Sequence, residues 1–254
     1  MSEIPLAKGI NWIRGTRREA PSRALRGKRE KPRKTPPEEK DGKGLAAQQE
    51  VNSLHYTIFD TSVLNAMLHR LSFFLLKIFG WRTEGRLPKV RKYVMIAAPH
   101  TSNWDLPVML TLSFAFRVKM FWMGKDALFR WPFGPLFRWL GGISIDRSKS
   151  TNAVEQSIEL FREREELVLV VPPEGTRKRV KYWKTGFYYI ASGAGVPIVL
   201  GFLDYRRKAG GFGPTITPTG DIEADMEKIQ AFYVNITGKY PAKTDHATVR
   251  PRGG

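Results

Sequence analysis

A chain of 254 residues with 42% apolar content is long enough to bury one sizeable core and requires no second domain. It contains no cysteine, which excludes a disulfide framework, a thiolate nucleophile and a cysteine-based zinc site. Its formal charge of +18 favours anionic partners such as nucleic acid, lipid headgroups, acidic carrier proteins or phosphorylated substrates, and charge alone does not choose among them.

Residues 1–52 are predicted to form a disordered basic tail. The run 26-RGKREKPRKTPPEEKDGKG-44 mixes charge, proline and glycine with almost nothing to bury. It has no apolar stretch typical of a secretory signal, and its acidic residues argue against a transit peptide. A solvated tail is the favoured interpretation, and a tail that binds nucleic acid or lipid headgroups is the alternative.

Residues 53–92 are predicted to contain an amphipathic helix, within 63-VLNAMLHRLSFFLLKIFGW-81. Apolar residues recur there at helical spacing, at Leu64, Met67, Leu71, Leu75 and Ile78. Two basic residues, Arg70 and Lys77, interrupt the segment, so it lacks the run of about twenty uncharged residues that a transmembrane helix needs. The pattern leaves two alternatives open: a helix packed on the domain, or one lying in a membrane interface.

Residues 93–240 are predicted to form an α/β domain, with a mixed, largely parallel sheet flanked by helices, and 241–254 a flexible C-terminal tail. Strands are expected at 93–98, 143–146, 167–171, 197–205 and 214–218. Helices are expected at 103–116, 151–165, 184–195 and 221–236. The alternation of short apolar strands with helices of this length is typical of such a sheet.

The stretch 97-AAPHTSNWDLPVML-110 places a histidine at the end of the first of these strands and an aspartate five residues later. As a helix start, Ser102 is a good N-cap and Asp105 occupies the third helical position, where it complements the helix dipole. The alternative is a proton-handling pair. In that case the turn folds the His100 ring onto the Asp105 carboxylate, and the carboxylate fixes the tautomer of the ring. Such a pair suits deprotonation of a substrate hydroxyl or activation of a serine.

A second candidate site follows the 167–171 strand, in 172-PPEGTRKRVKYWKTG-186. A glycine such as Gly175 lets a ligand approach the backbone, and Arg177 offers a planar fork to an oxyanion. A basic surface loop is the alternative interpretation. Arg147 comes just after the 143–146 strand, so three such features follow strands and are expected at one edge of the sheet.

Together these motifs resemble the lysophospholipid/glycerolipid acyltransferase family, the group that contains 1-acyl-glycerol-3-phosphate acyltransferase. The resemblance covers about residues 60–240, and its four blocks stand in the family's order: His100-Thr-Ser-Asn-Trp-Asp105, Gly142-Ile-Ser-Ile-Asp-Arg147, Pro173-Glu174-Gly175-Thr176-Arg177 with Lys184-Thr-Gly186, and Val196-Pro197-Ile198-Val199. The fourth block continues into Leu-Gly instead of a second proline, so acceptor preference is not readable there.

The resemblance implies an O-acyltransferase that moves a fatty acyl group from an acyl-CoA or acyl-carrier-protein thioester to a lysophospholipid hydroxyl. The default acceptor is 1-acylglycerol-3-phosphate, giving phosphatidate. In this scheme His100 is the general base and Asp105 orients it. The acceptor is held by the substrate-binding residues Arg147, Glu174, Gly175, Thr176, Arg177 and Lys184. Neither a metal nor an organic cofactor is expected.

The expected partners are therefore the lysophospholipid, the acyl-CoA or acyl carrier protein, and an anionic membrane surface, with no nucleic acid. The expected location is peripheral or monotopic, at the cytoplasmic face of a membrane. Two alternatives remain: a CoA-independent phospholipid–lysophospholipid transacylase, and a basic protein that binds nucleic acid or lipid surfaces without catalysis.

Overall fold

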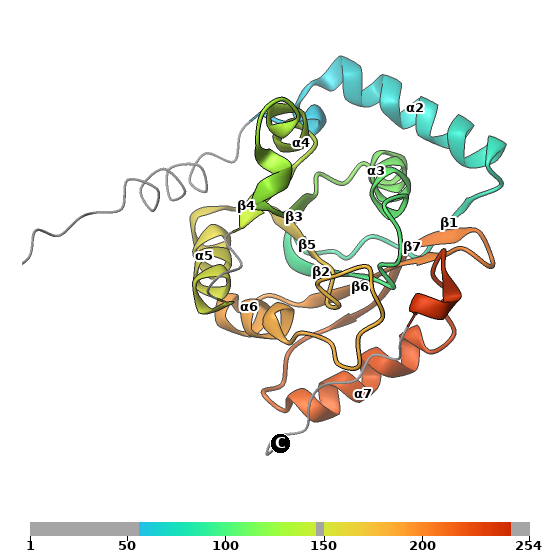
Figure 1. Ribbon diagram of the computed structural model, residues 1–254. Coiled ribbons are helices and arrows are strands. Elements are labelled where there is room, and N and C mark those ends of the chain that lie inside the picture. Colours follow the sequence, from blue (N-terminus) through green and yellow to red (C-terminus); the bar gives the residue numbers. More distant parts are fainter. Residues whose placement is uncertain (1–55, 146–149, 245–254) are drawn as a thin grey trace, which may run out of the picture. The chain divides into compact units, whose positions relative to one another are not determined.

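The computed structural model describes residues 56–145 and 150–244, all within one compact unit of the chain (Figure 1). The predicted tail of residues 1–52, Arg147 and residues 245–254 lie outside the described residues.

Seven strands form one sheet in the order β1-β7-β6-β2-β5-β3-β4. Their bounds are β1 (Arg82–Glu84), β2 (Lys92–Ala98), β3 (Phe121–Lys125), β4 (Gly142–Ile145), β5 (Leu167–Val171), β6 (Ile198–Asp204) and β7 (Ala209–Ile216). All neighbouring pairs are parallel except β6 and β7, which form an antiparallel hairpin. The predicted mixed, largely parallel sheet is confirmed.

The sequence did not predict β1, β3 or the first half of β7. Strand β1 has only three residues, and β7 begins Ala-Gly-Gly, so neither carries an apolar run. Strand β3 is a five-residue piece, Phe-Trp-Met-Gly-Lys, that is fixed by pairing with β4 and β5 on its two sides. Tertiary pairing therefore decides these strands.

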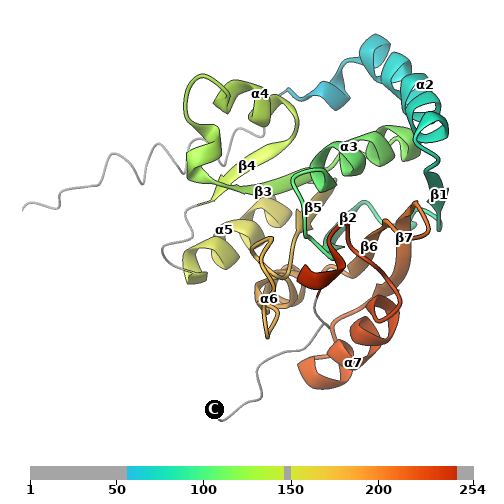
Figure 2. The ribbon, with the colours of Figure 1, turned by 45° about the vertical axis from the view of Figure 1, so that its right-hand side comes forward.

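Helices cover both faces of the sheet (Figure 2). Their bounds are α2 (Ser62–Ile78), α3 (Asp105–Phe116), α4 (Gly134–Trp139), α5 (Ser150–Glu163), α6 (Gly186–Ala194) and α7 (Ile222–Tyr233), with short 3-10 turns at Ile58–Asp60, Asp126–Phe129 and Pro241–Lys243. Helices α2, α3 and α4 lie on one side, and α5, α6 and α7 on the other. The predicted helices are confirmed with boundaries that differ by up to three residues.

Central strand β2 is buried on both faces because its side chains alternate. Val94 and Ile96 enter the core beneath α5, α6 and α7. Tyr93 and Met95 enter a second core, beneath α3. Both flanking strands pair with β2 in parallel, so its carboxyl end is held in place on either side, two residues before His100.

Helix α2 shows features of both alternatives left open by the sequence. It packs on the domain through a narrow side, where Ser72 and Leu76 are buried. Elsewhere on the helix, six large apolar residues are exposed beside the basic Arg70 and Lys77: Val63, Met67, Leu71, Phe73, Phe74 and Ile78. Among the described residues, none of the helices combines the length and apolar character needed to span a bilayer.

Candidate active site

The carboxyl ends of three adjacent parallel strands bring the site together. His100 lies two residues beyond β2, Glu174 three residues beyond β5, and Tyr205 directly after β6. Because parallel strands end at the same edge of a sheet, these segments meet although they are far apart in sequence.

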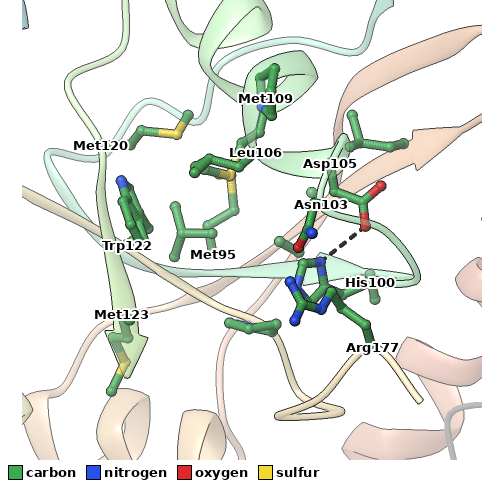
Figure 3. Close-up of a pocket in the computed structure, with 18 of the residues that line it drawn as sticks. Met95, His100, Asn103, Asp105, Leu106, Met109, Met120, Trp122, Met123 and Arg177 are labelled. Atoms are coloured by element: carbon green, nitrogen blue, oxygen red, sulfur yellow. Dashed lines mark hydrogen bonds and ion pairs between the residues drawn. The ribbon is translucent and has the colours of Figure 1, made fainter. Parts of the chain in front are cut away.

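His100 and Asp105 form the predicted pair (Figure 3). His100 Nδ1 lies 3.0 Å from Asp105 Oδ2, and the same oxygen accepts the backbone N–H groups of Thr101 and Ser102 at 2.9 Å each. Ser102 Oγ in turn accepts the Trp104 N–H at 3.1 Å. The helix itself begins at Asp105, two residues later than the sequence predicts. The N-cap is Trp104 instead of the predicted Ser102, and no side chain caps the helix. The Asp105 carboxylate binds the loop before the helix together with the histidine.

The tautomer of His100 follows from this contact. An ionised carboxylate only accepts hydrogen bonds, so Nδ1 carries the hydrogen and donates it to Asp105. Nε2 is then the ring nitrogen with a lone pair available to take a proton. Asp105 is only 6% exposed, whereas His100 is partly exposed and lines a cavity. The arrangement suits a general base that faces a substrate.

Tyr205 completes the surroundings of Asp105, and sequence reasoning missed it. Its hydroxyl donates to Asp105 Oδ1 at 2.8 Å. Burial, followed by this hydrogen bond, raises the pKa of the Tyr205 phenol. The only sequence feature that could have indicated a role at the site was the position of Tyr205 as the last residue of the predicted 197–205 strand.

Glu174 is a buried acidic residue that contacts the backbone of His100. It is 8% exposed, and its Oε1 accepts the His100 backbone N–H at 3.0 Å. Oε2 is buried without a hydrogen-bond partner among the described residues. Burial raises the pKa of this carboxyl from its ordinary 4.5 to about 7. Glu174 therefore contacts the histidine backbone, and its predicted part in holding substrate stays a prediction.

The loop after β5 carries the remaining candidates. Gly175 has φ +63°, and a side chain at that position would lie 3.1 Å from the side chain of Lys184. The Lys184 N–H donates to the Pro173 carbonyl at 2.8 Å, which closes the loop. Gly175, Thr176 and the exposed Arg177 line the same cavity as His100. The structure thus brings this loop beside the histidine, as predicted.

A cavity of about 700 Å³ extends from His100 into the space between α3 and the sheet (Figure 3). Most of its wall is apolar, with Met95, Ala97, Leu106, Met109, Leu112, Met120, Trp122, Val170, Leu203 and Phe212 among the lining residues. Polar groups gather at one end, at His100, Asn103, Asp105, Thr176 and Arg177. Sequence patterns did not reveal this cavity because its lining comes from seven separate helices and strands.

Within the described residues, no group of three or more His, Asp or Glu side chains could hold a metal ion. The expectation of no metal and no cofactor stays a prediction.

Comparison with known proteins supports the nature of this site. Residues 81–199 match the family model described as Acyltransferase. The match spans the His100–Asp105 pair and the 172–186 loop, so the site belongs to an enzyme of the acyltransferase class, transferase class 2.3.1. Residues 81–199 are therefore an acyltransferase domain, which agrees with the family that the four motif blocks indicated.

No curated protein matches the chain significantly. Among solved structures, it is similar to the 1-acyl-sn-glycerophosphate (LPA) acyltransferase PlsC from Thermotoga maritima. The identity is 18% and the TM-score 0.48, over 74% of this chain and 83% of that one.

The raised pKa of Glu174 predicts a pH-dependent stability. Because the pKa of this carboxyl is higher in the folded than in the unfolded state, the folded protein loses stability as the pH rises from about 4.5 to about 7. We expect the free energy of unfolding of Glu174→Gln to rise, relative to that of wild type, by on the order of 3 kcal/mol between these two pH values. Above about pH 7 the difference should stay constant. Urea denaturation of both proteins between pH 4.5 and pH 8 measures the difference.

Glu227→Gln, which changes an exposed carboxylate on α7, is the matched control. A stability difference between Glu174→Gln and wild type that stays constant over the whole range would contradict the prediction.

Proposed function

We propose that the protein transfers a fatty acyl group from an acyl-CoA or acyl-carrier-protein thioester to the hydroxyl of a lysophospholipid. The default acceptor is 1-acylglycerol-3-phosphate, and the product would be phosphatidate. The observation that carries the proposal is the His100–Asp105 pair, which opens into a large apolar cavity with Arg177 at the same end.

In the proposed reaction the acceptor hydroxyl attacks the thioester carbonyl directly. His100 Nε2 takes the hydroxyl proton as the C–O bond forms, and the C–S bond breaks to release the thiolate, which then receives the proton. Asp105 stabilises the imidazolium that forms between these steps. The absence of cysteine removes a thiolate nucleophile from the chain, which favours direct attack.

The cavity supports a fatty acyl substrate. Its volume of about 700 Å³ and its apolar wall suit a hydrocarbon chain, because each buried methylene contributes roughly 0.8 kcal/mol. The reacting carbonyl would lie at the polar end, near His100. Binding of the chain deep in the cavity would thereby place the reacting carbon against the base.

Arg177 supports a phosphorylated acceptor. Its side chain lies beside His100 at the polar end of the cavity (Figure 3), and a guanidinium binds phosphate through paired hydrogen bonds. We propose that Arg177 holds the acceptor phosphate, with the Gly175–Thr176 backbone and Lys184 beside it. Holding the phosphate would orient the hydroxyl towards Nε2.

We further propose that the protein binds the surface of an anionic membrane. Exposed apolar residues concentrate on α2 and on the segment 128–136, where Trp131 is 87% exposed. Both views place α2 and α4 on the side of the sheet that α3 covers, which is the side of the cavity. Arg70, Lys77 and Arg130 provide positive charge for lipid headgroups on the same segments.

His100→Ala tests the proposed function. We expect kcat for acyl transfer to fall by about two to four powers of ten, because the general base is removed. The measurement is mass spectrometry of products from purified enzyme, acyl-CoA or acyl carrier protein, and a panel of lysolipids. Activity that needs no added thioester would instead indicate a transacylase.

His69→Ala is the matched control, because His69 contacts the Phe114 carbonyl on α3, away from the pair. Near-normal turnover in a folded His100→Ala variant would refute the general-base role.

Arg177→Ala tests the phosphate assignment. We expect its KM for a phosphorylated acceptor to rise roughly tenfold or more, with little effect on acceptors that lack phosphate. Arg179→Ala removes the same charge from the same loop, outside the cavity lining, and should change the KM much less. Equal effects of the two substitutions would mean that only the net charge of the loop matters.

The membrane proposal predicts that Phe74→Ser with Ile78→Ser weakens partition to anionic vesicles by roughly tenfold, because two exposed apolar side chains on α2 are lost. Tyr189→Ser with Val234→Ser is the control, since these exposed residues lie on α6 and just after α7, on the opposite side of the sheet. Vesicle flotation measures both. Unchanged flotation of the α2 variant would count against membrane contact through this helix.

A further inference from the structure

The two oxygens of the Asp105 carboxylate have different partners. Oδ2 accepts three hydrogen bonds, from the His100 ring and the backbone N–H groups of Thr101 and Ser102. Oδ1 accepts from the hydroxyl of Tyr205, one hundred residues away in the chain. Among the described residues, every other hydrogen-bond donor to this carboxylate comes from its own loop.

We propose that Tyr205 is a positioning residue for acyl transfer, whose phenol fixes the rotation of the Asp105 carboxylate and thereby the direction of the His100 ring. The inference rests on the proposed function, in which His100 is the general base. Tyr205 has no direct contact with the reacting atoms in this scheme and acts through Asp105.

The physical reason lies in the torsion of the aspartate. Rotation about the bond between Cβ and the carboxyl carbon is soft, so the carboxylate plane is not fixed by the helix alone. A hydrogen bond on Oδ1 defines that plane and keeps Oδ2 towards the histidine. If the phenol hydroxyl were lost, a buried charged oxygen would be left without a partner, and the carboxylate would turn to regain one.

Tyr205 is itself held on several sides. Its ring packs nearly perpendicular to the Trp81 ring, with the centroids 5.0 Å apart, and the Lys239 ammonium lies 5.9 Å from the centroid of the Tyr205 ring. Its backbone N–H donates to the Thr237 carbonyl at 2.9 Å. These contacts leave the hydroxyl directed at Asp105.

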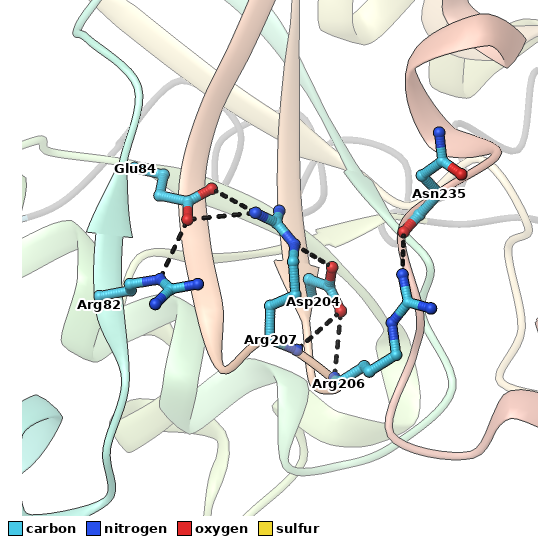
Figure 4. Close-up of polar contacts among 6 residues, drawn as sticks. All are labelled: Arg82, Glu84, Asp204, Arg206, Arg207 and Asn235. Carbon is cyan, nitrogen blue, oxygen red and sulfur yellow. Dashed lines mark hydrogen bonds and ion pairs between the residues drawn. The ribbon is translucent and has the colours of Figure 1, made fainter.

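The turn that carries Tyr205 is fixed by an ion-pair network (Figure 4). Fully buried Asp204 accepts the backbone N–H groups of Arg206 and Arg207, and pairs with Arg207 Nε at 2.6 Å. Arg207 also pairs with Glu84 of β1 at 3.0 Å, and Arg206 donates to the Asn235 carbonyl. The turn between β6 and β7 is thus tied to β1 and to the segment after α7, so the position of the phenol is defined.

The chain offers a matched comparison in a second tyrosine–aspartate pair. The Tyr188 hydroxyl donates to Asp225 Oδ2 at 3.0 Å, and Asp225 is fully buried between α6 and α7. Asp225 also accepts from Thr219 and Lys228, and it has no contact with His100. Tyr188→Phe therefore removes the same kind of tyrosine–aspartate hydrogen bond, together with the one that the Tyr188 hydroxyl accepts from the Gly220 N–H, at a position without contact to His100.

The test compares Tyr205→Phe with Tyr188→Phe and wild type. We expect Tyr205→Phe to lower kcat roughly tenfold, the effect of one hydrogen bond to a charged group, with the acceptor KM nearly unchanged. Tyr188→Phe should lower the melting temperature at least as much as Tyr205→Phe does, and it should leave kcat at the wild-type value. Equal kcat values for the two variants would overturn the proposal.

A second readout does not depend on activity. The hydrogen on His100 Nδ1, bound to a carboxylate, gives a downfield proton NMR resonance that is assigned by its loss in His100→Ala. We expect this resonance to shift or broaden in Tyr205→Phe and to persist unchanged in Tyr188→Phe. An unchanged resonance in Tyr205→Phe would overturn the proposal even if wild type transferred no acyl group, so the failure of the proposed function stays distinguishable.

Discussion

One buried carboxylate organises the site. Asp105, the first residue of α3, accepts hydrogen bonds from the loop that follows β2 and from the turn after β6. A buried charge left unpaired is costly, so these segments are held together by the need to satisfy a single side chain. The direction of the His100 ring is a consequence of the same requirement. Asp105 is thus both the first residue of α3 and the partner of the His100 ring, so both interpretations of this stretch contain part of the answer.

A second carboxylate lies close by in a different environment. Asp105 is surrounded by donors, whereas one oxygen of Glu174 is buried without a partner among the described residues. Burial accordingly dominates the behaviour of Glu174 and raises its pKa to about 7. The backbone of His100 is thus held by one acidic side chain and its ring by another. These two contacts hold the imidazole at the polar end of the cavity.

The sheet divides the molecule into two unlike halves. On the side of α5, α6 and α7, the core contains large, fully buried side chains such as Phe161 and Phe187. On the side of α3, the core gives way to the cavity, and α2 leaves much of its apolar surface exposed. The apolar cavity and the exposed apolar surface of α2 therefore lie on one side of the sheet, as the proposed uptake of substrates from a lipid surface requires.

The sequence by itself determined the α/β class, the main helices, the central strands and the His100–Asp105 and Arg177 motifs, because these depend on local periodicity and on short spacings. Only the tertiary structure decided the short strands β1 and β3, which exist through pairing with their neighbours. It alone also showed the cavity and the contact of Tyr205 with Asp105. Both are built from segments far apart in the chain, and no local pattern records which distant side chains the packing of a sheet will bring together.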